Sequence, residues 1–218
     1  MKRIFLSRPN WVAEGYLQGL KNFIQLLHAR GLDPRTIGVT DQPTMSPMDE
    51  VIKLMRKCEG AIILGFPQIR INEGLIKDIP VKDPISLATE WNHIEAALAH
   101  TLNLPILLIH DSSVIRGVFD RGATNIFLYS VDFSNESWPH GDDINGAIDS
   151  WSNRLDEVLT ENEASDSSTP TLKWGCYQFE GRDGLYCPAC YEMHGKMIPA
   201  ARLAGGHYKC PVCGAELS

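Results

Sequence analysis

The chain has 218 residues, of which 44% are hydrophobic and 22% charged, and its formal net charge is −7. These proportions are those of an ordinary globular protein and exclude a wholly disordered or fibrous chain. No apolar run approaches the ~18 residues that cross a bilayer, and the first run ends after Leu6, too early for a signal peptide. We therefore expect a cytoplasmic protein without membrane contact. The negative charge disfavours nucleic acid as a partner, because nucleic-acid binding needs clustered Lys and Arg.

Residues 1–159 alternate apolar runs with amphipathic stretches, which is typical of a parallel sheet covered by helices on both faces. The predicted strands are residues 3–6, 36–40, 61–65, 105–109 and 125–131. Five strands with helices between them predict an α/β domain with a flavodoxin-like, doubly wound parallel sheet.

Three of the helices have recognisable ends. The first is expected from Asn10 to Gly31, because glycine readily adopts the left-handed conformation that terminates helices. In the second, Ser46 is the expected N-cap and Asp49 the carboxylate of a capping box. The last begins near Asp142.

Ligands of doubly wound sheets bind beyond the carboxyl ends of the strands, and this rule selects the loops that follow them. Ser7 and Arg8 follow the first predicted strand, and Gly65 and Phe66 end the third. The guanidinium of Arg8 suits a phosphate, although a solvated surface role fits the sequence equally well.

Glu95 is the most informative single residue. On the expected helix at residues 89–100 it shares an apolar stripe with Trp91, Ile94 and Leu98. A carboxylate on a stripe that faces the protein requires a reason. Periodicity alone leaves two open: a functional role, or a structural role such as capping a backbone or pairing with an arginine.

Residues 95–107, EAALAHTLNLPIL, resemble a segment of nucleoside 2-deoxyribosyltransferases and of TIR-like domains. In those families the glutamate is essential for cleaving an N-glycosidic bond. Residues 4–9 and 49–64 are similar to the same families, so the resemblance covers most of residues 1–135 in order and spacing.

The residues just before Glu95 separate the two families. Deoxyribosyltransferases usually have a Gly and a Thr there, whereas residues 90–94 read EWNHI. The spacing from Trp91 to Glu95 is close to the S-x-W-x-x-x-E pattern of bacterial TIR-like defence proteins. Ser7 matches the serine that ends their first strand. The resemblance therefore favours a TIR-like domain.

A TIR-like domain implies an NAD⁺ glycohydrolase that cleaves the bond between nicotinamide and ribose, with a role in bacterial antiviral defence. NAD⁺ would then be a substrate rather than a cofactor. Glu95 would be catalytic, Arg8 would face the pyrophosphate, and Trp91 or Phe66 would stack on a base. The expected substrate-binding set is Ser7, Arg8, Gly65, Phe66 and Trp91. The resemblance also implies a homo-oligomer, because many TIR-like domains are active only when self-associated.

Two other classes of function remain open. One is a nucleoside or nucleotide N-glycosidase or deoxyribosyltransferase. The other is a non-catalytic module that senses a nucleotide or a protein. An open groove beside Glu95 favours an enzyme, whereas a Glu95 tied to an internal arginine favours the module.

Five of the six cysteines lie between residues 176 and 213, which marks a separate module. Two Cys-x-x-Cys pairs are separated by nineteen residues, a spacing typical of zinc ribbons. A gap of two residues lets both thiolates reach one tetrahedral ion. The predicted ligands of one structural Zn²⁺ are Cys187, Cys190, Cys210 and Cys213.

Disulfides are the alternative for these cysteines, and a cytoplasmic context disfavours them. Cys176, His194 and His207 lie close enough in sequence to replace a ligand. We place the ribbon at residues 171–218, behind an acidic, Ser-rich, flexible linker at residues 160–170. A segment this short buries little apolar surface, so the metal supplies its folding free energy. Its aromatic residues are candidates for contacting a protein partner or a base, although the ribbon's own small core is the simpler use for them.

Overall fold

The structure is a computed structural model that describes residues 1–218 except 121, 123–125, 127, 167–169, 181, 204 and 218. The side chains of residues 159–166 and 194 are also outside the description. The chain divides into two compact units, Met1–Glu157 and Val158–Ser218. Within the described residues no helix has the length and apolar character that a membrane span requires.

The first unit is built on a five-stranded parallel sheet with the order β2-β1-β3-β8-β9. Its strands are β1 (Lys2–Ser7), β2 (Leu32–Arg35), β3 (Gly60–Gly65), β8 (Ile106–Asp111) and β9 (Leu128–Val131). The chain leaves β1 toward β2 on one side and later returns to β3 on the other. This is the flavodoxin-like winding, so the predicted fold class is confirmed.

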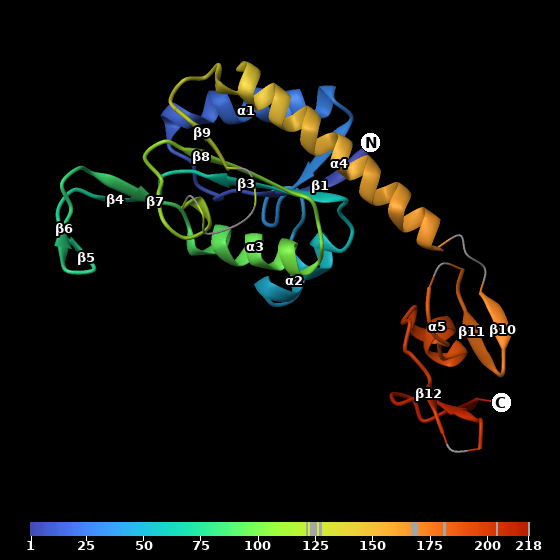
Figure 1. The fold of residues 1–218 in the computed structure, drawn as a ribbon. Coiled ribbons are helices and arrows are strands. Elements are labelled where there is room, and N and C mark those ends of the chain that lie inside the picture. Colours follow the sequence, from blue (N-terminus) through green and yellow to red (C-terminus); the bar gives the residue numbers. More distant parts are fainter. Residues whose placement is uncertain are drawn as a thin grey trace. The chain divides into compact units, whose positions relative to one another are not determined.

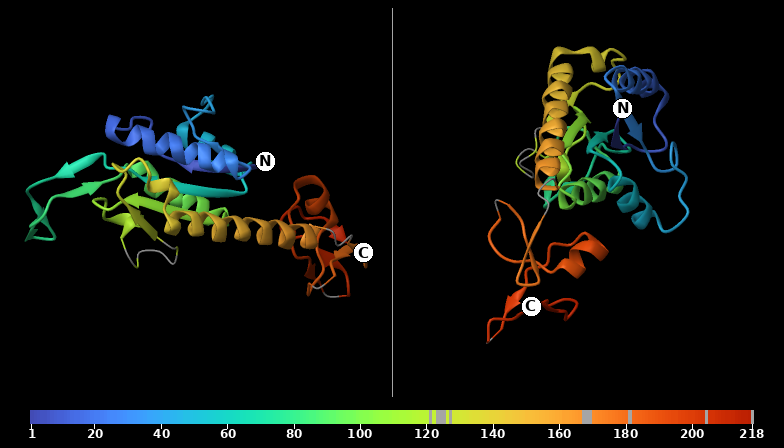
Figure 2. Two further views of the ribbon diagram at one scale, coloured as in Figure 1. Left: turned by 90° about the horizontal axis from the view of Figure 1, so that it is seen from above. Right: turned by 90° about the vertical axis from the view of Figure 1, so that its right-hand side faces the viewer.

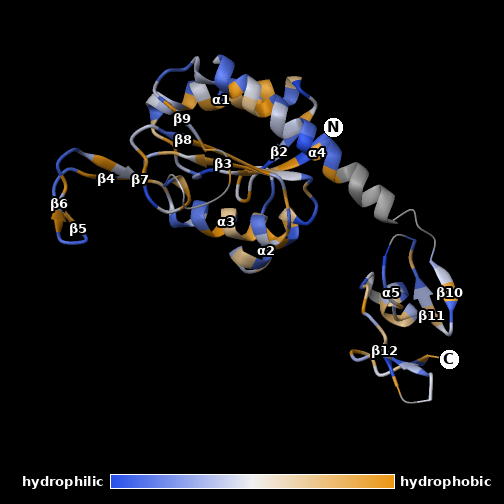
Figure 3. Cartoon of the chain, in the orientation of Figure 1, coloured by the Kyte–Doolittle hydropathy of each residue, from blue (hydrophilic) through white to orange (hydrophobic). Residues whose placement is uncertain are grey.

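Helices cover both faces of this sheet. Helices α1 (Glu14–Ala29) and α4 (Asp142–Asp166) lie on one face, and α2 (Pro47–Met55) and α3 (Glu90–Thr101) lie on the other (Figures 1 and 2). Two short 3₁₀ helices, η1 (Gly117–Phe119) and η2 (Trp138–His140), complete the unit. The central strands are the most hydrophobic part of the unit, as Figure 3 shows.

The alternation of side chains along the strands creates a separate core on each face. On β1, Ile4 and Leu6 belong to the core beneath α1 and α4, whereas Phe5 belongs to the core beneath α2 and α3. Strand β3 divides in the same way, with Ile62 on the first side and Ile63 on the second. Both strands are therefore buried on both faces.

The second strand does not lie where the sequence predicted it. Strand β2 is Leu32–Arg35, and residues 36–40 form a turn closed by hydrogen bonds to the Thr36 carbonyl. Pro34 sits within β2, which is tolerated because β2 is an edge strand and needs fewer backbone donors. The prediction was wrong because residues 36–40 include several β-branched side chains, which favour strands.

Two of the predicted helix ends agree with the structure. Gly31 follows α1 with φ +73°, and the Asp49 amide donates to the Ser46 side chain at 3.4 Å, so the cap of α2 is confirmed. Helix α1 begins at Glu14 rather than Asn10.

The segment predicted as a linker differs from the expectation. Helix α4 begins at Asp142 as predicted but extends to Asp166, so residues 160–166 are helical. Residues 167–169 of the predicted linker lie outside the described residues.

A two-stranded arm between β3 and α3 was not predicted. Strands β4 (Ile69–Ile71) and β7 (Ile85–Leu87) pair antiparallel, and β5 (Leu75–Ile76) and β6 (Ile79–Pro80) pair near the tip. The arm projects from the unit in both views (Figures 1 and 2).

The second unit contains β10 (Thr171–Lys173), β11 (Cys176–Gln178), α5 (Pro188–His194), β12 (Ala201–Arg202), β13 (Tyr208–Lys209) and β14 (Glu216–Leu217). Among its described residues, the small buried cluster contains Cys176, Cys187, Cys190, Cys210 and Leu217, and Phe179 is also buried. Few large apolar side chains are thus fully buried in this unit.

Gly60 offers a test of how tightly α4 packs on the sheet. A Cβ at this position would lie 2.5 Å from Leu155 Cδ2 and 2.8 Å from Trp151 Cζ2. We expect Gly60→Ala to lower the free energy of unfolding by about 1–3 kcal/mol through overpacking. Urea denaturation followed by circular dichroism measures this loss.

Gly146→Ala is the matched control. Gly146 is exposed on α4, and a Cβ there would meet no atom within 4 Å. Alanine favours the helix over glycine, so this variant should be more stable by about 0.5–1 kcal/mol. Equal losses in the two variants would contradict the close packing at Gly60.

Candidate functional site

A cavity of about 440 Å³ lies at the carboxyl edge of the sheet, where the winding reverses between β1 and β3. Its walls come from the loops after β1, β2 and β3 and from α2 and α3. The lining residues are Arg8, Pro9, Asn10, Trp11, Thr36, Ile37, Gly38, Pro43, Pro47, Val51, Gln68, Thr89, Trp91 and Glu95. A cavity of this size is within the range that holds small ligands.

Glu95 enters the cavity from α3. Thr89 caps this helix, since its side chain accepts a hydrogen bond from the Asn92 amide at 3.2 Å. The buried face of α3 is formed by Asn92, Ala96 and Ala99, not by the predicted stripe that begins at Trp91. Small side chains let α3 approach the sheet closely, which places Glu95 at the border between the buried face and the cavity.

Burial dominates the electrostatics of Glu95. It raises the pKa of the carboxyl from 4.5 to about 7, and the hydroxyl of Ser7 opposes this by interacting with the ionised form. The described residues include no ion pair to Glu95. A carboxyl that titrates near neutrality inside a cavity is typical of functional sites.

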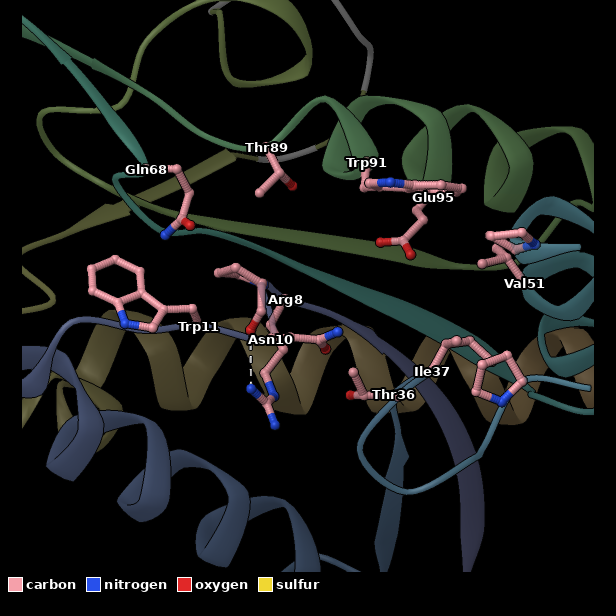
Figure 4. Close-up of a pocket in the computed structure, with 14 residues that line it drawn as sticks. Arg8, Asn10, Trp11, Thr36, Ile37, Val51, Gln68, Thr89, Trp91 and Glu95 are labelled. Carbon is pink, nitrogen blue, oxygen red and sulfur yellow. Dashed lines mark hydrogen bonds between the residues drawn. The ribbon is translucent and has the colours of Figure 1, made fainter.

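Arg8 lies on the wall opposite Glu95. Figure 4 shows Glu95 and Trp91 descending from α3, with Arg8 and Asn10 on the other side of the space. The Arg8 Nη1 donates to the Pro9 carbonyl at 3.0 Å, whereas its buried Nε has no partner among the described residues. Burial lowers the pKa of Arg8, which indicates a partly desolvated cation. Such a guanidinium suits an anionic group of a ligand.

Trp91 and Trp11 give the cavity aromatic surfaces. Trp91 is 40% exposed and Trp11 is 66% exposed, so both have ring surface available to a ligand. Trp91 was predicted for this role, whereas Trp11 was not.

Three other predicted residues do not line the cavity. Phe66 is fully buried and stacks on Phe133 with ring centroids 4.2 Å apart, in the core beneath α1 and α4. It therefore lies on the face of the sheet away from Glu95, and the prediction that it stacks on a base is not supported. Gly65 packs against Phe119 and His110, where an added Cβ would come within 3 Å of both. Ser7 is 1% exposed and lies behind the cavity, where it interacts with Glu95.

Several residues of the site were not predicted from the sequence. Asn92 is buried and donates from Nδ2 to Ser7 Oγ at 2.8 Å. Thr36 and Gln68 line the cavity from the loops after β2 and β3. The Thr-x-x-Asn spacing of Thr89 and Asn92 is a capping pattern that sequence inspection could have found. The residues on loops carry no comparable local pattern.

A second cavity of about 280 Å³ adjoins the first at Trp11 and Gln68, which line both. Its other lining residues include the side chains of Tyr16, Arg70, Ser86 and Ser113. Aromatic rings, hydroxyls and a guanidinium suit a hydroxylated ring compound with an anionic substituent.

The four predicted cysteine ligands come together in the second unit. Their Sγ atoms lie within 4.8 Å of one another, with 3.6 Å from Cys187 to Cys213 and 3.6 Å from Cys190 to Cys210. A tetrahedral ion with ~2.3 Å bonds to sulfur has ligand sulfurs about 3.8 Å apart, so these thiols fit a metal ion such as zinc. They form no disulfide, because all are free and far beyond bonding distance.

The backbone around these cysteines also favours a metal site. The Cys213 amide donates to Cys210 Sγ at 3.5 Å, and Gly214 has φ +73°, as expected for a knuckle. Cys176 is buried nearby but, like His207, does not belong to the group of four. The side chain of His194 lies outside the described residues.

Comparison with known proteins leaves the family open. No protein-family model and no curated protein sequence matches the chain. Among solved structures it is similar to a CMP N-glycosidase of Clostridium botulinum, with 18% identity and a TM-score of 0.39 over 62% of this chain and 92% of that chain. A likeness this distant shows nothing about the activity of this chain.

The raised pKa of Glu95 predicts how stability depends on pH. Between pH ~4.5 and about 7 the folded chain retains a proton on Glu95 that the unfolded chain has released, so the cost of this group to folding is absent below pH ~4.5, grows through this window and is complete above pH 7. We expect Glu95→Gln to raise the free energy of unfolding by about 2 kcal/mol at pH 8. The gain should vanish near pH 4.5.

Urea denaturation of wild type and Glu95→Gln at pH 5, 6, 7 and 8 measures this dependence. Glu90→Gln is the control, since Glu90 is exposed in the first turn of the same helix. A gain for Glu95→Gln that does not change with pH would show that the carboxyl is not perturbed in the folded chain.

Proposed function

We propose that the chain is a nucleotide N-glycosidase in which Glu95 acts on the sugar and Arg8 binds a phosphate. The observation that carries the proposal is the placement of these two residues on opposite walls of one cavity at the switch point of the sheet. A nucleotide has a sugar and an anionic group at a fixed separation, which matches a carboxylate and a guanidinium that belong to two walls of one cavity. The resemblance of residues 95–107 to N-glycosidic enzymes supports the same role for Glu95.

The chemistry needs few residues when the base is a good leaving group. In NAD⁺ the nicotinamide nitrogen is cationic, so breaking its bond to C1′ sends the electron pair to that nitrogen and releases neutral nicotinamide. No strong general acid is required. A carboxylate oxygen of Glu95 attacks C1′ or stabilises the oxocarbenium-like transition state. Water then adds at C1′, loses a proton to solvent and leaves ADP-ribose with a free carboxylate.

We propose NAD⁺ as the substrate in preference to a mononucleotide. The TIR-like resemblance supports NAD⁺, and so does the second cavity, which offers Tyr16 and Arg70 next to the wall formed by Trp11 and Gln68. A dinucleotide has a second nucleoside that such a cavity can accept. Hydrolysis of mononucleotides or nucleosides is the second candidate, because the cavity of about 440 Å³ alone has room for a mononucleotide.

Incubation with NAD⁺, nicotinamide mononucleotide, CMP and deoxyribonucleosides tests the proposal, with base release measured by chromatography. We expect release of nicotinamide from NAD⁺ and a loss of at least about 100-fold in kcat for Glu95→Gln. Glu90→Gln should keep wild-type activity because Glu90 is exposed outside the cavity. Nicotinamide mononucleotide contains the same scissile bond, so its turnover relative to NAD⁺ reports on the second cavity.

The other outcomes separate the alternatives. Turnover of CMP or deoxyribonucleosides without turnover of NAD⁺ would favour the mononucleotide or nucleoside enzyme. Nucleotide binding without release of any base, with the same affinity in Glu95→Gln, would favour a sensing module and contradict the enzymatic proposal.

We further propose that the metal held by the four cysteines is Zn²⁺ with a structural role. Four thiolates leave no open coordination position, which is typical of structural zinc. The slight apolar core of the second unit supports this role, since metal binding then supplies most of its folding free energy.

Metal analysis of the purified chain is expected to give one zinc per chain. Cys210→Ser should lower this ratio well below one, because it removes a ligand. Cys176→Ser is the matched control, since Cys176 is a buried cysteine of the same unit outside the group of four. Full zinc content in Cys210→Ser, or its loss only in Cys176→Ser, would contradict the proposed ligand set.

A further inference from the structure

We propose that Ser7 and Asn92 are positioning residues: a directed chain of hydrogen bonds that starts at the cap of α3 leaves the hydroxyl proton of Ser7 available to the Glu95 carboxyl. The inference rests on the role of Glu95 in the proposed function. It assigns a role to two residues that do not line the cavity.

The first link is at the N-terminus of α3. The Thr89 hydroxyl donates to Asn92 Oδ1 at 2.8 Å and accepts from the Asn92 amide at 3.2 Å. A hydroxyl has one proton to give. Because that proton is committed to Oδ1, the oxygen of the Asn92 side chain faces Thr89.

The Leu64 carbonyl fixes the orientation of the Asn92 amide independently. Asn92 Nδ2 lies 3.3 Å from the Leu64 carbonyl oxygen and 2.8 Å from Ser7 Oγ. A carbonyl oxygen only accepts, so a reversed amide would set two acceptors against each other. Both protons of Nδ2 are therefore used, one on Leu64 and one on Ser7.

This orientation determines what Ser7 does. Its Oγ accepts from Asn92, so its single proton is free to be donated elsewhere, and the Glu95 carboxyl is an acceptor with which Ser7 interacts. Ser7 and Asn92 are each 1% exposed, so water does not compete for the hydrogen bonds that they make. A hydrogen bond donated to a carboxylate favours its ionised form. Catalytic contacts of this kind often tighten only when substrate binds.

Apart from burial, this chain of hydrogen bonds is the main local influence on the ionisation of Glu95. Burial raises the pKa of Glu95 and Ser7 lowers it. Arg8, from the loop after β1, is the other charged residue that lines the cavity, and it is not among the groups that shift the pKa of Glu95. The lining residues from the loops after β2 and β3 and from α2 are uncharged. On α3, Glu90 is exposed and His93 accepts from the Val118 amide, away from the cavity.

The test is the titration midpoint of Glu95, measured by ¹³C NMR of side-chain carboxyl groups in the full chain, with Glu95→Gln to assign the resonance. We expect a midpoint near 7 in wild type and a rise of about one pH unit in Ser7→Ala, which removes the donor. Asn92→Ala should shift it in the same direction by less. In the double variant, Asn92→Ala should add nothing, because Asn92 acts through Ser7.

Ala97→Ser is the matched control, since Ala97 is exposed on the same helix and touches none of these groups; its midpoint should equal that of wild type. Thr89→Ala serves as a second probe of the chain should Asn92→Ala not fold. In the pH profile of kcat/KM, the acid limb should move with the NMR midpoint. A role confined to packing would lower stability but leave both midpoints in place.

A midpoint that stays at the wild-type value in both Ser7→Ala and Asn92→Ala would overturn the inference. The NMR measurement needs no substrate, so it is independent of the proposed function. Shifted midpoints without cleavage of any nucleotide would uphold the hydrogen-bond chain and refute the enzyme. Cleavage of a nucleotide with unshifted midpoints would uphold the enzyme and refute the hydrogen-bond chain.

Discussion

The close packing of α3 against the sheet is the constraint on which the site depends. Ala96 and Ala99 are buried beneath the helix, and their small side chains let its axis come near β3 and β8. At that distance Asn92 reaches both Ser7 and the Leu64 carbonyl. Larger residues at the two alanines would lift the helix, break these contacts and withdraw Glu95 from its place beside Ser7.

Glu95 is held between two opposing influences. Burial favours the neutral carboxyl, while the hydroxyl of Ser7 favours the carboxylate, and the balance leaves the group titrating near neutral pH. A carboxylate that is neither fully solvated nor tied to a cation is available to stabilise positive charge on a sugar. In the proposed function, Arg8 on the opposite wall would bind a phosphate, and one cavity would then hold both the group that acts on the sugar and the group that binds the anion.

The second unit follows a different physical logic. Its buried cluster is small and holds cysteines in place of large apolar residues, among them three of the four candidate ligands, Cys187, Cys190 and Cys210. Thiolates that converge on one point repel each other unless an ion lies between them. The candidate metal site is therefore set by residues in two short segments, whereas the cavity of the first unit is assembled from five separate segments of the chain.

The parts that the sequence predicted well are those encoded by neighbouring residues. The cap formed by Ser46 and Asp49, the termination at Gly31 and the two Cys-x-x-Cys pairs were all recognisable, because each depends on spacings of a few residues. The parallel sheet was predicted from the alternation of apolar runs. Strand β2 was misplaced because its four residues, with a proline among them, have weak strand propensity and owe their place to the pairing with β1.

The amino-acid sequence by itself determined the fold class, the four cysteines that can hold a metal and Glu95 as the residue to examine. Only the tertiary structure decided that Glu95 borders a cavity with Arg8, that Phe66 faces the opposite core, and that Asn92 lies against Ser7. The physical reason is the range of the interactions. Caps and metal knuckles arise within a few residues, whereas the site joins Ser7 to Asn92 across 85 positions of the chain, a contact that exists only once the helix packs on the sheet.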